Sequence, residues 1–229
     1  MIDAATISHA AFPKEPIRFS GGEYRACCFD NCSLAAAGPA GAYSYIGQCV
    51  LIRSRQLACG LSGVVLDEVL VDGLARLGRM PLFLSAVVFR HVTLRGRISM
   101  FKLNPTPQPL PTPGQRESWI GAHLEFYRNV DWALDISRAD FTFGPDLHYV
   151  PGQLIRRDEE TQALVERDAL QNALWQSLPW GGSALRVAVD WFLQDGPYQS
   201  TVLVAGRKTK SFRQDLDALE MLRREGLAL

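Results

Sequence analysis

The 229-residue sequence lacks an excess of charge of either sign, because 24 Lys and Arg balance 24 Asp and Glu. A chain without net charge has no overall field to attract nucleic acid or an anionic membrane surface, so we expect neither as a partner. The same balance argues against a DNA mimic, which would need a strong acidic excess. We expect a protein partner instead.

Long apolar runs are also missing. Apolar runs such as Leu82–Leu84 and Val87–Phe89 are far too short to span a bilayer. Met1–Pro13 has no basic start followed by a sustained apolar stretch, so no export signal is evident. The five cysteines are odd in number and all lie between Cys27 and Cys59. Together these features predict reduced thiols in a cytoplasmic protein.

What the sequence does contain is a recurring six-residue pattern. Each unit has a large apolar residue, two variable residues, a small apolar residue, any residue and a large apolar residue. Apolar spacings of three and two, in units rich in Val, Ile and Phe, favour strands over helices. The units are Phe29–Leu34, Ile46–Leu51, Leu66–Val71, Phe89–Leu94, a weaker Trp119–Leu124, and Ile136–Phe141.

One such unit cannot bury its apolar face alone, but stacked units form a continuous core. Ala139-Asp140-Phe141 resembles the motif of pentapeptide-repeat proteins, and Cys32-Ser33-Leu34 and Val92-Thr93-Leu94 resemble it less closely. The resemblance covers roughly residues 19–143 and implies a right-handed β-helix that serves as a binding scaffold. Here the units are separated by ten or more less regular residues, which leaves a wider and less regular right-handed β-helix as an alternative.

We therefore predict a mostly β fold with two parts. Residues 1–150 form a β-solenoid, with a proline-rich, extended insertion at 104–118. Residues 151–229 form an α-rich cap that covers the last coil. Within the cap, acidic residues at the start of 158–178 and the pattern of 211–226 predict helices, and 201–205 predicts a strand. Periodicity does not decide whether 183–194 is a helix or a strand.

The cysteines invite a zinc site, but the repeat places Cys32 and Cys49 at small inward positions, where cysteine acts as a small hydrophobe. No paired CxxC spacing, nucleophile elbow, Walker loop or HExxH motif is present. We therefore expect neither cofactor nor metal. His91 and His123 fall at similar positions in their units and are the candidates for acid–base chemistry, although scattered surface histidines explain them as well.

The leading functional prediction is a non-catalytic protein that binds another protein, most concretely a bacterial immunity protein that sequesters a cognate toxin. One alternative is an enzyme with a site on the solenoid face that acts on a saccharide or nucleotide. The other is a DNA mimic of the pentapeptide-repeat kind that protects a topoisomerase. All five Trp lie in the second half of the chain, and a short basic cluster precedes the last helix. The residues expected at a partner surface are Trp119, His123, Trp132, Trp180, Arg207, Lys208 and Lys210.

Overall fold

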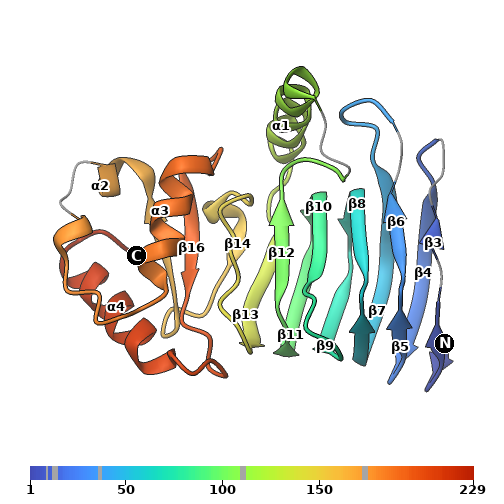
Figure 1. The fold of residues 1–229 in the computed structure, drawn as a ribbon, viewed down its shortest axis with the longest axis horizontal. Coiled ribbons are helices and arrows are strands. Elements are labelled where there is room, and N and C mark those ends of the chain that lie inside the picture. Colours follow the sequence, from blue (N-terminus) through green and yellow to red (C-terminus); the bar gives the residue numbers. More distant parts are fainter. Residues whose placement is uncertain (9, 12–14, 36–37, 109–111, 172–174) are drawn as a thin grey trace.

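The computed structural model describes all residues except 9, 12–14, 36–37, 109–111 and 172–174. The described part is mostly β, and its main element is one large, mostly parallel sheet that curls into a half-barrel (Figure 1). Its strands are β1 (Ile2–Asp3), β2 (Thr6–Ile7), β3 (Ala10–Ala11), β4 (Arg18–Arg25), β5 (Cys28–Asp30), β6 (Ser33–Ala35), β7 (Ser44–Leu57), β8 (Gly60–Asp67), β9 (Leu70–Arg76), β10 (Leu82–Arg90), β11 (Val92–Ile98), β12 (Phe101–Asn104), β13 (Leu134–Phe141) and β14 (Ile155–Arg156).

The six-residue pattern marks corners of this sheet. A residue with positive φ, in the left-handed backbone conformation, turns the chain sharply. This conformation is uncommon for residues other than glycine. The apolar residues before and after the corner then point into the half-barrel, which explains why they are three positions apart. In four units the third residue has a positive φ: Asn31 (50°), Gln48 (53°), Glu68 (52°) and His91 (56°).

Three of the units stack in register, as expected for a repeat. Ile46 pairs with Leu66, and Leu66 pairs with Phe89. The first unit belongs to a different corner, because Leu34 pairs with Leu61 on β8. The 17 residues between the first two units therefore separate two different corners of the sheet. Only the next two intervals, from Ile46 to Leu66 and from Leu66 to Phe89, correspond to stacked strands.

The resemblance to pentapeptide-repeat proteins is not upheld, because the chain forms a curled parallel sheet instead of a regular array of five-residue sides. Its best match, Ala139-Asp140-Phe141, lies inside β13, a strand that is described throughout and contains no left-handed residue. The fourteen-residue strand β7 has two corners, at Gln48 and Arg53. The pairing of β11 with β13 also shifts register after Thr93. These irregularities remove the five-residue period.

Helix α1 (Pro113–Tyr127) overturns two further predictions. The extended insertion predicted over 104–118 ends early, because its last six residues are helical. Proline is favoured in the first turn of a helix, and the side chain of Gln115 accepts the backbone N–H of Thr112 at 3.0 Å. The weak unit Trp119–Leu124 is consequently part of the helix and not of a strand. Pro109 and Pro111 lie outside the described residues.

The C-terminal region contains a two-stranded antiparallel sheet and several helices, which lie at the end of the large sheet opposite the N-terminus (Figure 1). The sheet continues beyond residue 150, because Ile155 of β14 pairs with Leu134 of β13. None of the described helices is long and apolar enough to cross a bilayer. The elements are two 3₁₀ turns (Gly152–Leu154 and Trp175–Ser177), β15 (Gln162–Glu166), β16 (Ser200–Val204), α2 (Arg167–Gln171), α3 (Leu185–Asp195) and α4 (Phe212–Arg224).

The predictions for this region are partly confirmed. The helix expected over 158–178 is wrong for residues 158–166, which form a turn and β15, because burial against β16 outweighs the helical pattern. It is confirmed only for α2, residues 167–171, and residues 172–174 lie outside the described part. The strand at 201–205 is confirmed as β16, and most of the segment 183–194, from Leu185 on, belongs to helix α3. The last helix is also confirmed as α4, and Gly226 follows it with a φ of 69°.

Candidate functional site

The inside of the half-barrel encloses an apolar cavity of about 520 Å³. It begins at the N-terminal strands, where Ile17 and Phe19 line it and remain 41% and 44% exposed. It ends at Phe101 and Leu134, both buried. Among the described residues that line it, none is charged. The large sheet therefore surrounds an uncharged space with one end near solvent.

Most polar groups in this lining are already satisfied. The Cys49 thiol donates to the Gly47 carbonyl at 3.2 Å, and burial raises its pKa, which keeps it protonated. Gln56 is the exception. Its Oε1 accepts the Cys59 backbone N–H at 3.3 Å, but its Nε2 has no hydrogen-bond partner although the residue is only 3% exposed. One unpaired donor thus lies in the wall of the cavity.

The volume of the cavity makes it more than a packing defect. Its volume of about 520 Å³ is many times the roughly 30 Å³ that one molecule occupies in liquid water. Water fills apolar cavities poorly, because each molecule needs two to four polar partners. The space therefore favours an apolar occupant.

The outer face of the same sheet is polar. Arg90 holds Asp67 with two hydrogen bonds, of 2.8 and 2.6 Å, and the Tyr45 hydroxyl donates to the same carboxylate at 2.9 Å. The hydrogen bonds from Arg90 hold the pKa of Asp67 below its usual value. Arg18 lies 3.8 Å above the Tyr45 ring. Gly47 is required here, because a side chain at this position would collide with the Tyr45 ring.

A shallow groove lies at the next corner and has a volume of about 620 Å³. Its centre is His91, whose Nε2 lies 2.6 Å from Asp131 Oδ1 and whose ring lies 4.9 Å from that of Trp132. The guanidinium of Arg156 lies 4.0 Å from the Trp132 ring. The hydrogen bond with His91 lowers the pKa of Asp131. The groove is lined by Glu68, Val69, Leu70, His91, Thr93, Arg95, Asp131 and Trp132.

Of the seven residues expected at a partner surface, Trp132 lies in this groove and three others are buried. Trp119 and His123 on α1 are 5% and 1% exposed, and Trp180 is 6% exposed. His123 lies 2.8 Å from the carbonyl oxygen of Tyr149, and burial lowers its pKa to about 4. These three side chains belong to the packing of α1 and of the C-terminal region.

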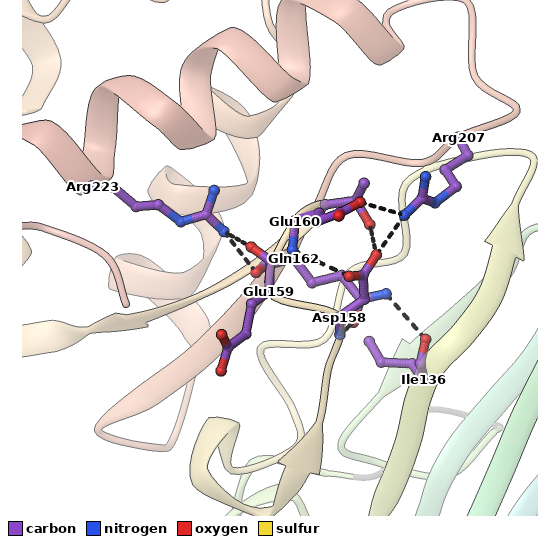
Figure 2. A network of polar contacts seen from close by, with 8 residues as sticks. Ile136, Asp158, Glu159, Glu160, Gln162, Arg207 and Arg223 are labelled. Atoms are coloured by element: carbon purple, nitrogen blue, oxygen red, sulfur yellow. Dashed lines mark hydrogen bonds and ion pairs between the residues drawn. The ribbon is translucent and has the colours of Figure 1, made fainter.

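The remaining three, Arg207, Lys208 and Lys210, lie between β16 and α4. Figure 2 shows that the guanidinium of Arg207 faces Asp158, at 2.7 Å, and Glu160, at 3.4 Å. Arg207 therefore ties the loop before β15 to the loop before α4. Lys208 and Lys210 are exposed.

The other predicted features do not come together as a catalytic centre. His91 binds Asp131 on the outer face, while His123 is buried against Tyr149, so the two histidines occupy different surroundings. Cys32 and Cys49 line the interior cavity, as the repeat predicts. Within the described ranges, no group of three or more His, Cys, Asp or Glu side chains is placed to hold a metal ion.

The contacts on the outer face also have a signal in the sequence. Asp67 and Arg90 occupy the second position of successive units, and Asp72 and Arg95, which form an ion pair of 3.1 Å, follow those same units. Opposite charges at equivalent positions of stacked units indicate pairing across strands. Because acids alternate with bases here, this face gives no support to an acidic stripe of the DNA-mimic kind.

Comparisons with known proteins do not assign the chain to a family. No family model matches it. No curated protein and no solved structure matches it either.

Proposed function

We propose that this chain is a non-catalytic binding protein that holds a protein partner at the groove around Trp132. The observation that carries the proposal is the contact of the Trp132 ring with both His91 and Arg156, in a shallow groove. Trp and Arg are the residues that contribute most to protein–protein affinity, and they act best at partly desolvated centres of an interface.

The charges around the groove favour a polar macromolecular partner. Glu68 and Asp131 lie beside Arg95 and His91, so the surface presents both signs within one groove. Such mixed patterns select a partner by complementary pairs and not by a single long-range field. Both ring neighbours and the fixed β-sheet below hold the Trp132 side chain, which reduces the entropy that binding would remove.

The concrete form that we propose is an immunity protein that sequesters a cognate toxin. Tight neutralisation needs a rigid surface, and the groove is built on hydrogen-bonded strands at the His91 corner. The test is whether the partner recovered with this chain inhibits bacterial growth when expressed alone, and whether co-expression of this chain relieves the inhibition. A partner without any effect on growth contradicts the immunity role.

The test of the binding site compares two tryptophans. Trp132→Ala should weaken binding of the recovered partner by at least thirtyfold, as expected for a hot-spot residue. Trp191→Ala is the matched control, because Trp191 is 40% exposed on α3 and also lies near a cation, Lys102. Calorimetric titration of the purified partner measures both effects. Equal losses in the two variants would contradict a site at the groove.

A second candidate function rests on the pair formed by His91 and Asp131. A carboxylate 2.6 Å from an imidazole can orient it for general acid–base work, and the neighbouring Trp132 could stack on a sugar ring or a base. This candidate is an enzyme that acts on a saccharide or nucleotide. It predicts turnover that His91→Ala abolishes, whereas the binding role predicts none in either protein.

A further inference from the structure

The interior cavity and the groove on the outer face share one described lining residue, Val69, but their chemistry is different. Its described lining carries no charged side chain, and its thiols donate to backbone carbonyls. The Nε2 atom of Gln56 therefore stands out as a hydrogen-bond donor without an acceptor. It belongs to a residue that is only 3% exposed.

We propose that this cavity is a binding site for an elongated, uncharged molecule with one alkyl chain and one oxygen acceptor, of the class of a long-chain alcohol or acyl ester. The apolar walls contact the chain, and Gln56 Nε2 donates to the oxygen. The volume of about 520 Å³ lies within the range typical of small-molecule sites. The mouth is at Ile17 and Phe19, where the lining is exposed.

The assignment of the donor follows from the backbone. If the amide group of Gln56 were turned over, Nε2 would face the Cys59 N–H, and two donors would oppose each other. The oxygen therefore faces Cys59, and the amino group remains available for a ligand.

The uncharged class follows from the same lining. An ionised carboxylate would lose its hydration in the cavity and would meet no cation among the described lining residues. A free fatty acid at neutral pH should consequently bind more weakly than an alcohol of equal chain length. A plain alkane should also bind more weakly, because it leaves the Gln56 donor unpaired.

The experiment uses equilibrium dialysis of the full chain against radiolabelled 1-dodecanol, dodecane and dodecanoate. Wild type should bind one dodecanol per chain, with an affinity about tenfold above that for dodecane, as one hydrogen bond allows. Gln56→Met should remove this tenfold preference and leave the affinity for dodecane unchanged. Trp132→Ala, on the outer face, should bind all three ligands as wild type does.

A second variant keeps the test meaningful if Gln56→Met folds poorly. Cys49→Leu adds volume inside the cavity and should weaken dodecanol and dodecane alike. Circular dichroism confirms that each variant is folded before titration. Three results would overturn the proposal: no binding of dodecanol by wild type, dodecanol binding that neither variant changes, or tighter binding of dodecanoate than of dodecanol.

Discussion

The two hydrophobic cores of this chain are built in different ways. In the large sheet, backbone hydrogen bonds hold each strand to its neighbours, and a cavity of about 520 Å³ remains between the walls. In the C-terminal region, α3 and α4 supply fully buried side chains that pack with a small two-stranded sheet. Strands bonded on both sides keep a fixed spacing, whereas helices can move until their side chains meet.

Buried polar groups are present in both regions. In the C-terminal region Asp215 accepts hydrogen bonds from the hydroxyls of Ser183 and Ser211, both at 2.7 Å. The guanidinium of Arg167 donates to carbonyls at the end of α3, including that of Phe192 at 2.8 Å. Each region also has a buried polar atom without a hydrogen-bond partner, Gln56 Nε2 in the large sheet and Thr201 Oγ1 in β16, but of these two residues only Gln56 lines the cavity. The two regions therefore differ in how completely their interiors are filled more than in how their polar groups are paired.

The largest expected effect comes from one substitution made in each core. Leu222→Ala removes a fully buried side chain of α4 and should lower the free energy of unfolding by about 3–5 kcal/mol. Leu84→Ala, in the cavity wall, should lower it by only about 2 kcal/mol, because one side of Leu84 already faces a void. Urea unfolding measures both. Equal losses would show that the sheet interior is packed as tightly as the helical core.

Acid pH tests the contacts of α1, whose His123 is nearly inaccessible to solvent. Its pKa is about 4 in the folded chain and about 6.5 when unfolded, so the unfolded chain takes up the proton first. Stability should therefore fall by about 3 kcal/mol as the pH drops from 6.5 to 4. His123→Gln, which can still donate to Tyr149, should lack this part of the pH dependence. Identical urea midpoints against pH in both proteins would contradict the prediction.

The sequence predicted the stacked corners but not what lies between them. Ile46 and Leu66 occupy equivalent positions of their units and pair directly, because the apolar residue before a corner must point inward. Gln56 lies outside the six-residue units, between Ile46–Leu51 and Leu66–Val71, so the repeat makes no prediction for it. Within β7 the positive-φ residues Gln48 and Arg53 shift the inward and outward alternation twice, so strict alternation from Ile46 places Cys49 and Leu51 on the wrong face and is correct again at Gln56.

Helix α1 had a readable signal that the prolines obscured. Thr112, Pro113 and Gln115 have the order of a helix start, with a capping residue, a first-turn proline and a side-chain acceptor. The groove at Trp132 was only partly foreseeable. The aromatic ring of Trp132 predicts a contact residue, but its neighbour Arg156 comes from β14, and the pairing of β14 with β13 has no counterpart in the repeat.

Two buried glutamines provide a smaller and more specific comparison. Gln162 donates to the Ile136 carbonyl and accepts from the Asp158 backbone N–H, each at 3.0 Å (Figure 2). Gln162→Met should lower the free energy of unfolding by about 2 kcal/mol, because the buried Ile136 carbonyl and the partly buried Asp158 N–H lose their partners. Gln56→Met should change it by less than about 1 kcal/mol, since one long hydrogen bond and one unpaired donor disappear together. Urea unfolding of both variants in the absence of lipid measures the two effects.

The smallest effect should also reverse its sign between the two regions. Val69→Ile extends into the cavity and should raise the free energy of unfolding by about 0.8 kcal/mol, the value of one buried methylene. Val189→Ile, at a fully buried position of α3, should lower it by about 1 kcal/mol, because no space is available for the added carbon.

Both substitutions replace one β-branched residue with another, so changes in backbone preference are small and the sign reports on space alone. The measurement is thermal unfolding in lipid-free buffer, repeated with a saturating amount of 1-dodecanol. With dodecanol bound, the advantage of Val69→Ile should shrink, because the added methyl then competes with the alkyl chain, while Val189→Ile should respond as wild type does. A stabilising effect of both substitutions, or of neither, would mean that the sheet and the helical region do not differ in how completely their interiors are filled.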